Sequence, residues 1–494
     1  MTGQLHERDW QVWWDAPADH VQTARQSIID SGADDTVVRA ALVHLAAPAL
    51  TARSVAAAAG VPAGTVEQAY RLCRDDSTVR SFTASACYAH RLWYQAAAVL
   101  AARWQADSSL PARLLAGQPV PPDTVEIHPS RGTCAYGCAM CLWSDKDTLT
   151  YATRDLRADG LLTLGQWTGL LDQLRRLGAG RLVVSGGGEA LLNPDLPAIL
   201  GHAGHLGFST SLYTTGFNLD AHRGALWGPV AGLAAVRLSI HSPDPATYAH
   251  IVRLPERVQA FDRVTDHVRH LLNLRAERGT GPRLGIGFVL QPGNHGQIEA
   301  MADYAASVGV DHLDLRKDEV DVTDGLTPAE LAAAAAQLRR VRERAADGAY
   351  GRLEVDLGDE LVALANGQPV ARSRSSECRI KYLRPTISPY GVLAPCDLKA
   401  EPRFADSAFN LGVITRQPIA ELVDTLPDRP IADACDQCMP SSRTGNSAAD
   451  KLLTDLRDGL PLNGQPFATT ATPALSTTET VHPTGASGTS GRGR

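Results

Sequence analysis

Short apolar runs alternate with helical patterns over the middle of this chain. The runs that we expect to form strands are 124–130, 181–186, 208–214, 235–242, 283–290 and 311–316. Thr163 with Gln166 forms a capping box that predicts a helix start after the first run, and Thr327 with Glu330 forms another before an Ala-rich helix. Strands that alternate with helices form parallel sheets. The pattern predicts an α/β fold, a partial TIM-like (β/α)6 barrel, with chemistry at the carboxyl ends of its strands.

Three further segments flank this core, which we place at residues 121–350. Residues 1–120 are Ala-rich, with apolar residues at helical spacing, and predict a helical N-terminal domain. Residues 370–445 form a smaller unit, in which Gly and Pro punctuation predicts a hairpin. Residues 464–494 are rich in Thr, Ser, Gly and Pro and lack apolar periodicity, so we expect a disordered tail.

The N-terminal domain contains a segment, 50–72, whose sequence pattern is typical of a helix-turn-helix, with Gly60 at the turn. DNA binding would need a basic surface. Residues 1–120 contain ten Arg and eleven Asp or Glu, and the whole chain has a net charge of −7. We therefore expect a helical cap on the core and no nucleic-acid partner. The missing basic surface also argues against a non-enzymatic alternative, an iron–sulfur sensor with a DNA-binding head.

The chain also lacks the features of a membrane or secreted protein. Its first residues carry acids and no long apolar run, unlike a secretory signal. No stretch approaches the roughly 18 apolar residues of a transmembrane helix. We therefore expect a cytoplasmic protein with no membrane partner.

Nine cysteines are distributed unevenly. Cys73 and Cys87 lie in apolar helical patterns and are expected to be small buried residues. The other seven are clustered, which in a reducing cytosol indicates metal ligation and not disulfides. They are Cys134, Cys138, Cys141, Cys378, Cys396, Cys435 and Cys438.

The first cluster, in RGTCAYGCAMCLW, has C-x3-C-x2-C spacing on the loop that leaves the first predicted strand. Three thiolates are one fewer than the four that usually hold a [4Fe–4S] cluster. The fourth iron would then be open to an external ligand. A zinc or ferredoxin-like site is the alternative, although structural zinc needs four ligands and this loop offers no His.

This spacing, its place after the first strand and the β/α pattern resemble the radical SAM superfamily. The resemblance implies that S-adenosylmethionine (SAM) binds the open iron. It also implies that an electron from an external donor, such as flavodoxin or ferredoxin, yields a 5′-deoxyadenosyl radical that takes hydrogen from the substrate. Members of the family usually have an aromatic residue before the third Cys, where this chain has Met140.

The string VVSGGGEALLNPDL resembles the Gly-Gly-Glu motif of the same family. It implies that Gly187, Gly188 and Glu189 hold the amino group of SAM. Ser239 matches a position that contacts the SAM ribose, with barrel packing as the alternative. Arg316, at the end of the sixth strand, is expected to face SAM or substrate, with a surface charge as the alternative.

The second cysteine set resembles the SPASM/twitch extension of radical SAM enzymes. Cys378 and Cys396 flank Gly391, and Cys435 with Cys438 forms a C-x2-C pair. Four of the seven SPASM cysteines are present, which implies a twitch-type domain with one auxiliary [4Fe–4S] cluster. A zinc ribbon is the alternative. Full cysteine ligation leaves electron transfer as the role of the cluster and favours an oxidation.

The barrel and N-terminal domain also resemble the radical SAM deaminase of nucleotide amino sugars in desosamine biosynthesis, loosely from 50 to 360. That deaminase lacks the auxiliary cysteines. We expect a small polar substrate (a sugar, aminocyclitol or nucleoside-like molecule) that is oxidised in specialised metabolism such as antibiotic biosynthesis. The alternatives are epimerisation, crosslinking or maturation of a ribosomally made peptide, or radical elimination from a nucleotide sugar. His241, Asp318 and Tyr213 lie near strand ends, but the sequence assigns no catalytic acid or base.

Overall fold

The structure is a computed structural model of the chain. It describes residues 26–46, 56, 59–76, 109–130, 134–141, 143–145, 150–151, 160–222, 228–230, 232–318, 325–366, 377–429 and scattered positions from 431 to 457. Cys87 and the predicted tail at 464–494 lie outside the described residues.

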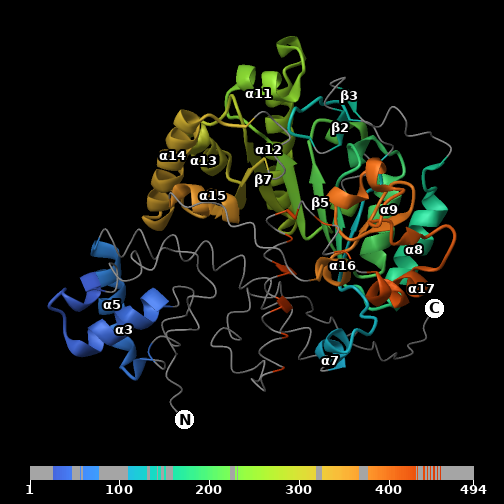
Figure 1. Cartoon of the computed structure of the whole chain (residues 1–494). Helices are drawn as coiled ribbons and strands as arrows, with labels where there is room; N and C mark the ends of the chain where they lie inside the picture. The colour runs from blue at the N-terminus through green and yellow to red at the C-terminus, as the bar shows by residue number, and fades with distance from the viewer. Residues whose placement is uncertain are drawn as a thin grey trace, which may run out of the picture.

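The centre of the fold is a parallel sheet that confirms the predicted α/β class (Figure 1). Every predicted run contains a strand. The parallel strands are β1 (Thr124–Ile127), β4 (Arg181–Val184), β5 (Ser209–Thr214), β6 (Ala235–Ser239), β7 (Arg283–Leu290), β8 (His312–Lys317) and β9 (Glu354–Leu357).

Helices connect these strands and cover one face of the sheet. They are α8 (Leu164–Arg176), α9 (Leu196–His205), α11 (Pro245–Val252), α12 (Ala260–Arg278), α13 (Ile298–Val308), α14 (Pro328–Ala346) and α15 (Asp359–Ala365). The predicted capping box at Thr163 begins α8, and a second one, Thr327 with Glu330, begins α14.

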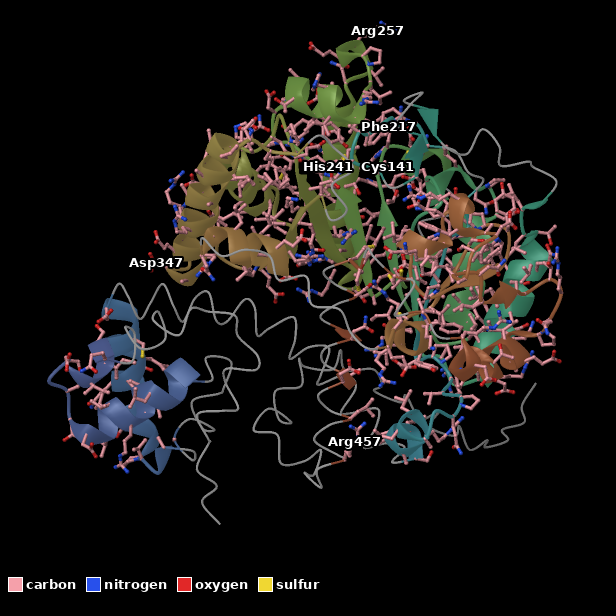
Figure 2. All side chains as sticks on the ribbon, viewed as in Figure 1. Cys141, Phe217, His241, Arg257, Asp347 and Arg457 are labelled. Atoms are coloured by element: carbon pink, nitrogen blue, oxygen red, sulfur yellow. The ribbon has the colours of Figure 1, made fainter. Side chains whose placement is uncertain are left out.

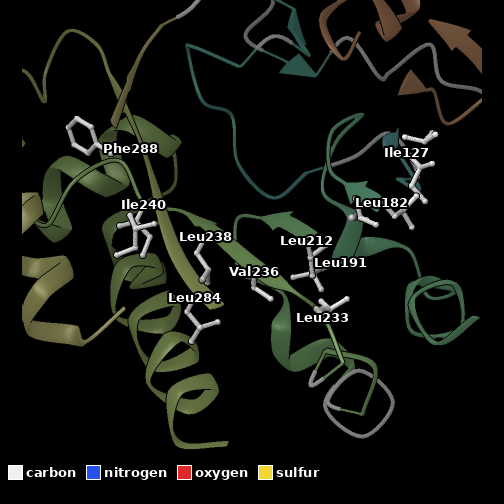
Figure 3. Packing of buried hydrophobic residues seen from close by; sticks show 14 of the residues in the cluster. Ile127, Leu182, Leu191, Leu212, Leu233, Val236, Leu238, Ile240, Leu284 and Phe288 are labelled. Carbon is white, nitrogen blue, oxygen red and sulfur yellow. The ribbon is translucent and has the colours of Figure 1, made fainter. Parts of the chain in front are cut away.

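The two faces of the sheet differ because side chains alternate along a strand. Leu182, Leu212, Val236 and Leu284 are buried on the outer face, in the core that the helices share (Figure 3). The residues between them point to the inner face and are mostly polar. On β6, for example, Arg237 is half-buried between Val236 and Leu238, which are fully buried. The inner face is therefore where a polar ligand could bind.

The sheet is longer than the sequence predicted. The strand β9 was missed, because it has only four residues and two of them are acidic. At the other edge, β10 (Thr386–Ile387) pairs in parallel with β1. The predicted hairpin is formed by β10 and β11 (Val392–Ala394), and β12 (Gly412–Val413) follows. These strands of the C-terminal unit thus extend the barrel sheet.

The remaining elements are short or lie outside the sheet. In the N-terminal domain, α3 (Asp35–Ala46) and α5 (Ala63–Asp75) pack around a small core of their own that includes Cys73. Burial raises the pKa of Cys73 to about 12, as expected for a small buried residue. The other elements are α7 (Ser109–Leu115), the β2–β3 hairpin (Ser144–Asp145 and Thr150–Tyr151), α16 (Ile380–Leu383) and α17 (Ile419–Asp424).

None of the helices in the described part of the chain is long and apolar enough to span a lipid bilayer.

Gly285 of β7 provides a test of the inner-face packing. A Cβ at this position would overlap the ring of His312 on β8. We expect Gly285→Ala to lower the free energy of unfolding by about 1–3 kcal/mol through overpacking. Gly169→Ala is the control, because no atom lies within 4 Å of a Cβ there and Ala is the better helix former. Denaturant unfolding of both variants gives the comparison, and equal stability would contradict the close packing at β7.

Candidate functional site

The first cysteine loop is held against α11 by hydrogen bonds from Tyr136 and Gly137. The amide of Gly137 donates to the carbonyl of Val252 at 2.9 Å. The hydroxyls of Tyr136 and Tyr248 lie 3.0 Å apart, so the loop is tied to α11. Tyr248 also donates to the carbonyl of Ser239, at the end of β6. These bonds hold the loop over the carboxyl ends of the strands.

The three thiols of this loop lie within electrostatic reach of one another. Burial raises the pKa of Cys138 well above its usual value, and the neighbouring Cys141 and Cys134 raise it further. The protein itself therefore compensates little of the charge that three thiolates would carry. A metal centre would supply that compensation, because bound cations favour the thiolate form. The chemistry of this donor set fits an iron–sulfur cluster.

The second set is also brought together. Burial raises the pKa of Cys396 well above its usual value, with smaller effects from Asp397, Cys378 and Cys435. Burial likewise raises the pKa of Cys378, and Cys435 adds to it. The side-chain amide of Asn446 donates to the sulfur of Cys438 at 3.9 Å.

Asn446 connects Cys438 to the segment directly after Cys378 through hydrogen bonds. Its side-chain oxygen accepts hydrogen bonds from the amides of Arg379 and Ile380, directly after Cys378. Among the described residues, no three His, Cys, Asp or Glu side chains surround a single point as the ligands of one ion would. In a [4Fe–4S] cluster each thiolate binds a different iron, so the thiols lie further apart than ligands of one ion.

The two sets of thiols are neighbours in the fold. Cys141 packs with Trp143, Ala394 and Ala400 in one small apolar cluster. Ala394 and Ala400 lie on either side of Cys396 in the sequence. The end of the first loop therefore rests directly on the segment that carries the second set.

The triple glycine after β4 lies against both β1 and the C-terminal hairpin. Gly186, Gly187 and Gly188 all have positive φ angles, which glycine adopts without strain. A Cβ on Gly186 would lie 2.5 Å from Nε2 of His128, and one on Gly187 would lie 2.9 Å from Cγ of Pro389. Only glycine allows this loop to pack so closely against the end of β1 and the C-terminal hairpin.

Glu189 is buried, and its carboxylate already accepts four hydrogen bonds from the protein. Oε1 accepts from the amide of Leu191 at 3.0 Å and the hydroxyl of Thr214 at 2.6 Å. Oε2 accepts from the amide and the hydroxyl of Thr215 at 2.7 and 2.6 Å. A carboxylate has about four acceptor positions. An ammonium group at Glu189 would therefore have to share them with Thr214 and Thr215, which the sequence did not predict.

The other predicted residues lie at different depths on the inner face. Ser239 ends β6, close to the first cysteine loop. Arg316 is the next-to-last residue of β8, and its guanidinium lies 3.3 Å from Asp356. Met140 is buried and its sulfur accepts from the side-chain amide of Gln291, which follows β7.

His241 lies at the same end of the sheet as Cys141 and Phe217 (Figure 2). Burial and the nearby Arg237 lower its pKa to about 3. Its Nδ1 accepts a hydrogen bond from the amide of Val289 at 3.3 Å, which requires the neutral ring. Asp318 is buried after β8, and Tyr213 is half-buried on β5. Arg237 lies near two of these candidates, His241 and Tyr213.

Sequence reasoning missed a buried polar group beneath the first loop. It consists of Glu126 and His128 on and after β1, Ser185 after β4 and Arg384 before β10. Burial opposes ionisation of Glu126, but His128 and Arg384 lower its pKa to about 2. Glu126 and His128 stand two apart in TVEIHPS, so both face inward, and this alternation was the available signal.

A charged network on the opposite wall was also missed. Arg237 and Asp314 occupy inner positions of β6 and β8 and form an ion pair at 3.2 Å. The guanidinium of Arg237 lies over the ring of Tyr213, 3.8 Å from its centroid. The runs VRLS and HLDLR place these charges at alternate positions, which marks them as inner-face residues.

Comparison with known proteins gives two relatives from Streptomyces. The chain is 30% identical over 267 residues to a PqqA peptide cyclase of Streptomyces rochei, covering 54% of this chain and 68% of that protein. It is 28% identical over 289 residues to the dTDP-4-amino-4,6-dideoxy-D-glucose ammonia-lyase of Streptomyces venezuelae. That match covers 56% of each protein, just over half the length of the ammonia-lyase.

Among solved structures, the chain is similar to Streptococcus suis SuiB bound to S-adenosylmethionine. The TM-score is 0.45 at 19% identity, and the match covers 63% of this chain and 67% of that one. The chain matches no protein-family model.

The buried neutral His241 makes stability depend on pH. Its folded pKa, about 3, lies below the ordinary value of 6.5, so the unfolded chain binds the proton more tightly. The stabilisation that the folded protein gains from a neutral His241 is therefore complete above the pKa of the unfolded chain and is lost as the pH falls below it. Between pH 7.5 and 5.5 we expect a loss of about 1.4 kcal/mol that His241→Gln does not show. Unfolding midpoints at both pH values test this, with His205→Gln on the exposed end of α9 as the control. Equal pH dependence in wild type and His241→Gln would contradict the prediction.

Proposed function

This chain belongs to the radical SAM enzymes, as its two Streptomyces relatives do, and we propose that it oxidises a small polar substrate by hydrogen-atom abstraction. We further propose that Cys134, Cys138 and Cys141 hold the cluster that binds SAM. In this proposal Cys378, Cys396, Cys435 and Cys438 hold a second cluster. A reduced flavodoxin or ferredoxin would supply the electron.

The observation that carries this proposal is the packing of the first cysteine loop against the segment that carries Cys396. Cys141 packs against the small cluster of Trp143, Ala394 and Ala400, and the two alanines flank Cys396 in the sequence. An electron that leaves a substrate bound beside the first loop would therefore reach the second set through packed protein. When bound, the two clusters and SAM supply a hydrogen-abstracting radical and an electron acceptor.

The residues of the chain would then act around the reacting groups. Glu189, held in place by Thr214 and Thr215, would accept from the amino group of SAM, and Gly187 and Gly188 would let the backbone approach it closely. Ser239 lies at the end of β6, where it would contact the ribose. His241 stays neutral at the pH of the cytosol, so it would act as a hydrogen-bonding group without charge.

The proposed reaction is balanced without a further oxidant. The substrate carbon loses a hydrogen atom, which ends on the deoxyadenosine cleaved from SAM. The same carbon would then lose one electron to the cluster that the second set of thiols would hold, and its hydroxyl group would lose a proton. An alcohol thus becomes a carbonyl, with two electrons removed in total.

The inner face of the barrel supports a polar substrate. Tyr213, Arg237, Asp314 and Arg316 line it, and apolar side chains occupy the outer face. Charged groups at this position would bind the hydroxyl or amino groups of a ligand and would disfavour an apolar one.

A second candidate is the modification of a ribosomally made peptide. It is favoured by the match to a PqqA peptide cyclase, at 30% identity. The match to a nucleotide-sugar ammonia-lyase, at 28% identity, likewise keeps radical elimination as an alternative. The neighbouring genes would distinguish these substrates. A precursor-peptide gene would support a peptide substrate, and glycosyltransferase or aminotransferase genes would support a sugar substrate.

Two clusters can be counted directly. We expect anaerobically reconstituted protein to hold about eight irons and the Cys134/Cys138/Cys141→Ala triple variant to hold about four. Dithionite and SAM should yield 5′-deoxyadenosine with the wild type and none with the triple variant. Iron analysis and chromatography of the products give both results. Saturation of the wild type at four irons would refute the second cluster, and absence of 5′-deoxyadenosine would refute the function.

The role of Glu189 can be separated from that of the cluster. We expect Glu189→Ala to weaken SAM binding by about tenfold or more, because a charge-assisted hydrogen bond is lost, and to leave the iron content unchanged. Thr215→Val is the matched control, because it keeps the carboxylate and removes one of its donors, so its effect should be smaller. Equilibrium binding of SAM and iron analysis test this, and unchanged affinity in Glu189→Ala would remove the assignment.

A further inference from the structure

We propose that Arg237 and Asp314 bind the hydroxyl and amino groups of a substrate ring that carries no phosphate. This inference rests on the proposed function and narrows its substrate to an unphosphorylated polyhydroxylated or amino-bearing ring. The ion-pair row in which the two residues lie consists of Arg237, Asp314, Arg316 and Asp356, on the inner face of β6, β8 and β9.

The ion-pair row spans four strands of the sheet, β6 to β9, and takes its residues from β6, β8 and β9. Arg237 lies 3.2 Å from Asp314, and Arg316 lies 3.9 Å from Asp314 and 3.3 Å from Asp356. The side chains are between 14% and 28% exposed, so they are accessible from the inner side and are not sealed in the core. Tyr213 supports the guanidinium of Arg237 from the neighbouring strand β5.

Glycines make space for these side chains to lie flat on the sheet. A Cβ on Gly287 would lie 3.2 Å from Nε of Arg237, and one on Gly358 would lie 2.9 Å from Cδ of Arg316. Both long side chains therefore lie across a neighbouring strand where it has no side chain.

The charges on this face are balanced. Each arginine that the structure places there is close to a carboxylate: Arg181 to Asp123, Arg237 to Asp314, Arg283 to Glu354, Arg316 to Asp356 and Arg384 to Glu126. A phosphate ester needs cations whose charge is not already compensated, as in an arginine fork. A phosphorylated substrate would also be repelled by the carboxylates of the row.

A ring with hydroxyl and amino groups fits the same row well. A hydroxyl group both donates and accepts, so it can bridge a guanidinium and a carboxylate, and an ammonium group can donate to a carboxylate. In Arg237, Nη1 donates to Asp314, and Nη2 makes no hydrogen bond to any residue that the structure describes. Arg237 can thus donate to a ligand without losing its ion pair.

Arg237 lies next to the position that we propose for SAM, where a substrate would have to bind for hydrogen abstraction. Arg237 and Ser239 are two residues apart on β6 and share its inner face. Ser239 is the nearer of the two to the first cysteine loop, to which Tyr248 connects it. A ring held by Arg237 would lie directly beneath the position proposed for SAM.

The test uses anaerobically reconstituted holoenzyme with SAM present. Calorimetric titrations would compare 2-deoxystreptamine, glucosamine and glucosamine 6-phosphate, the last two of which differ by one phosphate. We expect at least one unphosphorylated probe to bind, and glucosamine 6-phosphate to bind about tenfold more weakly than glucosamine or not at all. Arg237→Gln and Asp314→Asn should each weaken the binding of the unphosphorylated probe by about tenfold or more.

Arg283→Gln is the matched control. Arg283 lies on the same face of the sheet and forms an ion pair with Glu354 at 2.9 Å, but at the amino end of β7. It should leave probe affinity unchanged, and Arg237→Lys provides a second variant if Arg237→Gln does not fold. Equal or tighter binding of the phosphorylated probe, no binding of any probe, or equal effects of Arg237→Gln and Arg283→Gln would overturn the inference.

The same preparation distinguishes this inference from the proposed function. Formation of 5′-deoxyadenosine from SAM and dithionite does not depend on the ion-pair row. A preparation that forms it and fails the titrations refutes the substrate assignment alone. A preparation that forms none refutes the radical function itself.

Discussion

The parallel pairing of β10 with β1 is the constraint on which the arrangement of the site depends. The first cysteine loop follows β1, and Cys396 follows the hairpin that begins with β10. Because Glu126 and Ile127 pair with Thr386 and Ile387, and Thr386 in turn pairs with Ala394, the segment of Cys396 leaves the sheet only two strands away from β1. Residues more than 240 positions apart are thereby brought into one apolar cluster of Trp143, Ala394 and Ala400, against which Cys141 packs. A slip in this register would displace one set of thiols from the other.

The glycine loop after β4 reinforces that pairing. Gly186 is covered by His128 from β1, and Gly187 is covered by Pro389 from the turn of the C-terminal hairpin. The hydroxyl of Ser130 also donates to the carbonyl of Gly187 at 2.5 Å. The loop that leads to Glu189 is thus held between the segment before the first thiols and the segment before Cys396. Its conformation and the position of the C-terminal hairpin are coupled.

The sequence predicted elements whose signal is local, and failed where the signal depends on contacts between strands. The six main strands and the capping boxes at Thr163 and Thr327 follow from patterns within a few residues, and they are confirmed. The strand β9 has only EVDL to identify it. The hairpin of β10 and β11 was predicted, but the pairing of β10 with β1 extends over only two residues and leaves no pattern in the sequence. The four donors around Glu189 come from separate segments that only the fold brings together. The spacing of Cys134, Cys138 and Cys141, by contrast, lies within one loop, so it could be interpreted without knowledge of the fold.

The composition of the inner face indicates that it was not shaped for stability alone. The interior of a TIM-like barrel is usually filled by layers of Val, Ile and Leu, which bury apolar area and need no partners. Here β7 contributes Gly285 and Gly287 to the inner face, and the strands beside it contribute Arg237, His312 and Asp314. Ion pairs that are partly removed from water stabilise a fold little, because desolvation offsets much of their attraction. Glycine in a strand also weakens it. Both choices are understandable if the face must keep space and fixed charges for a ligand, since a site of balanced, preoriented charges rejects molecules that leave those charges unpaired.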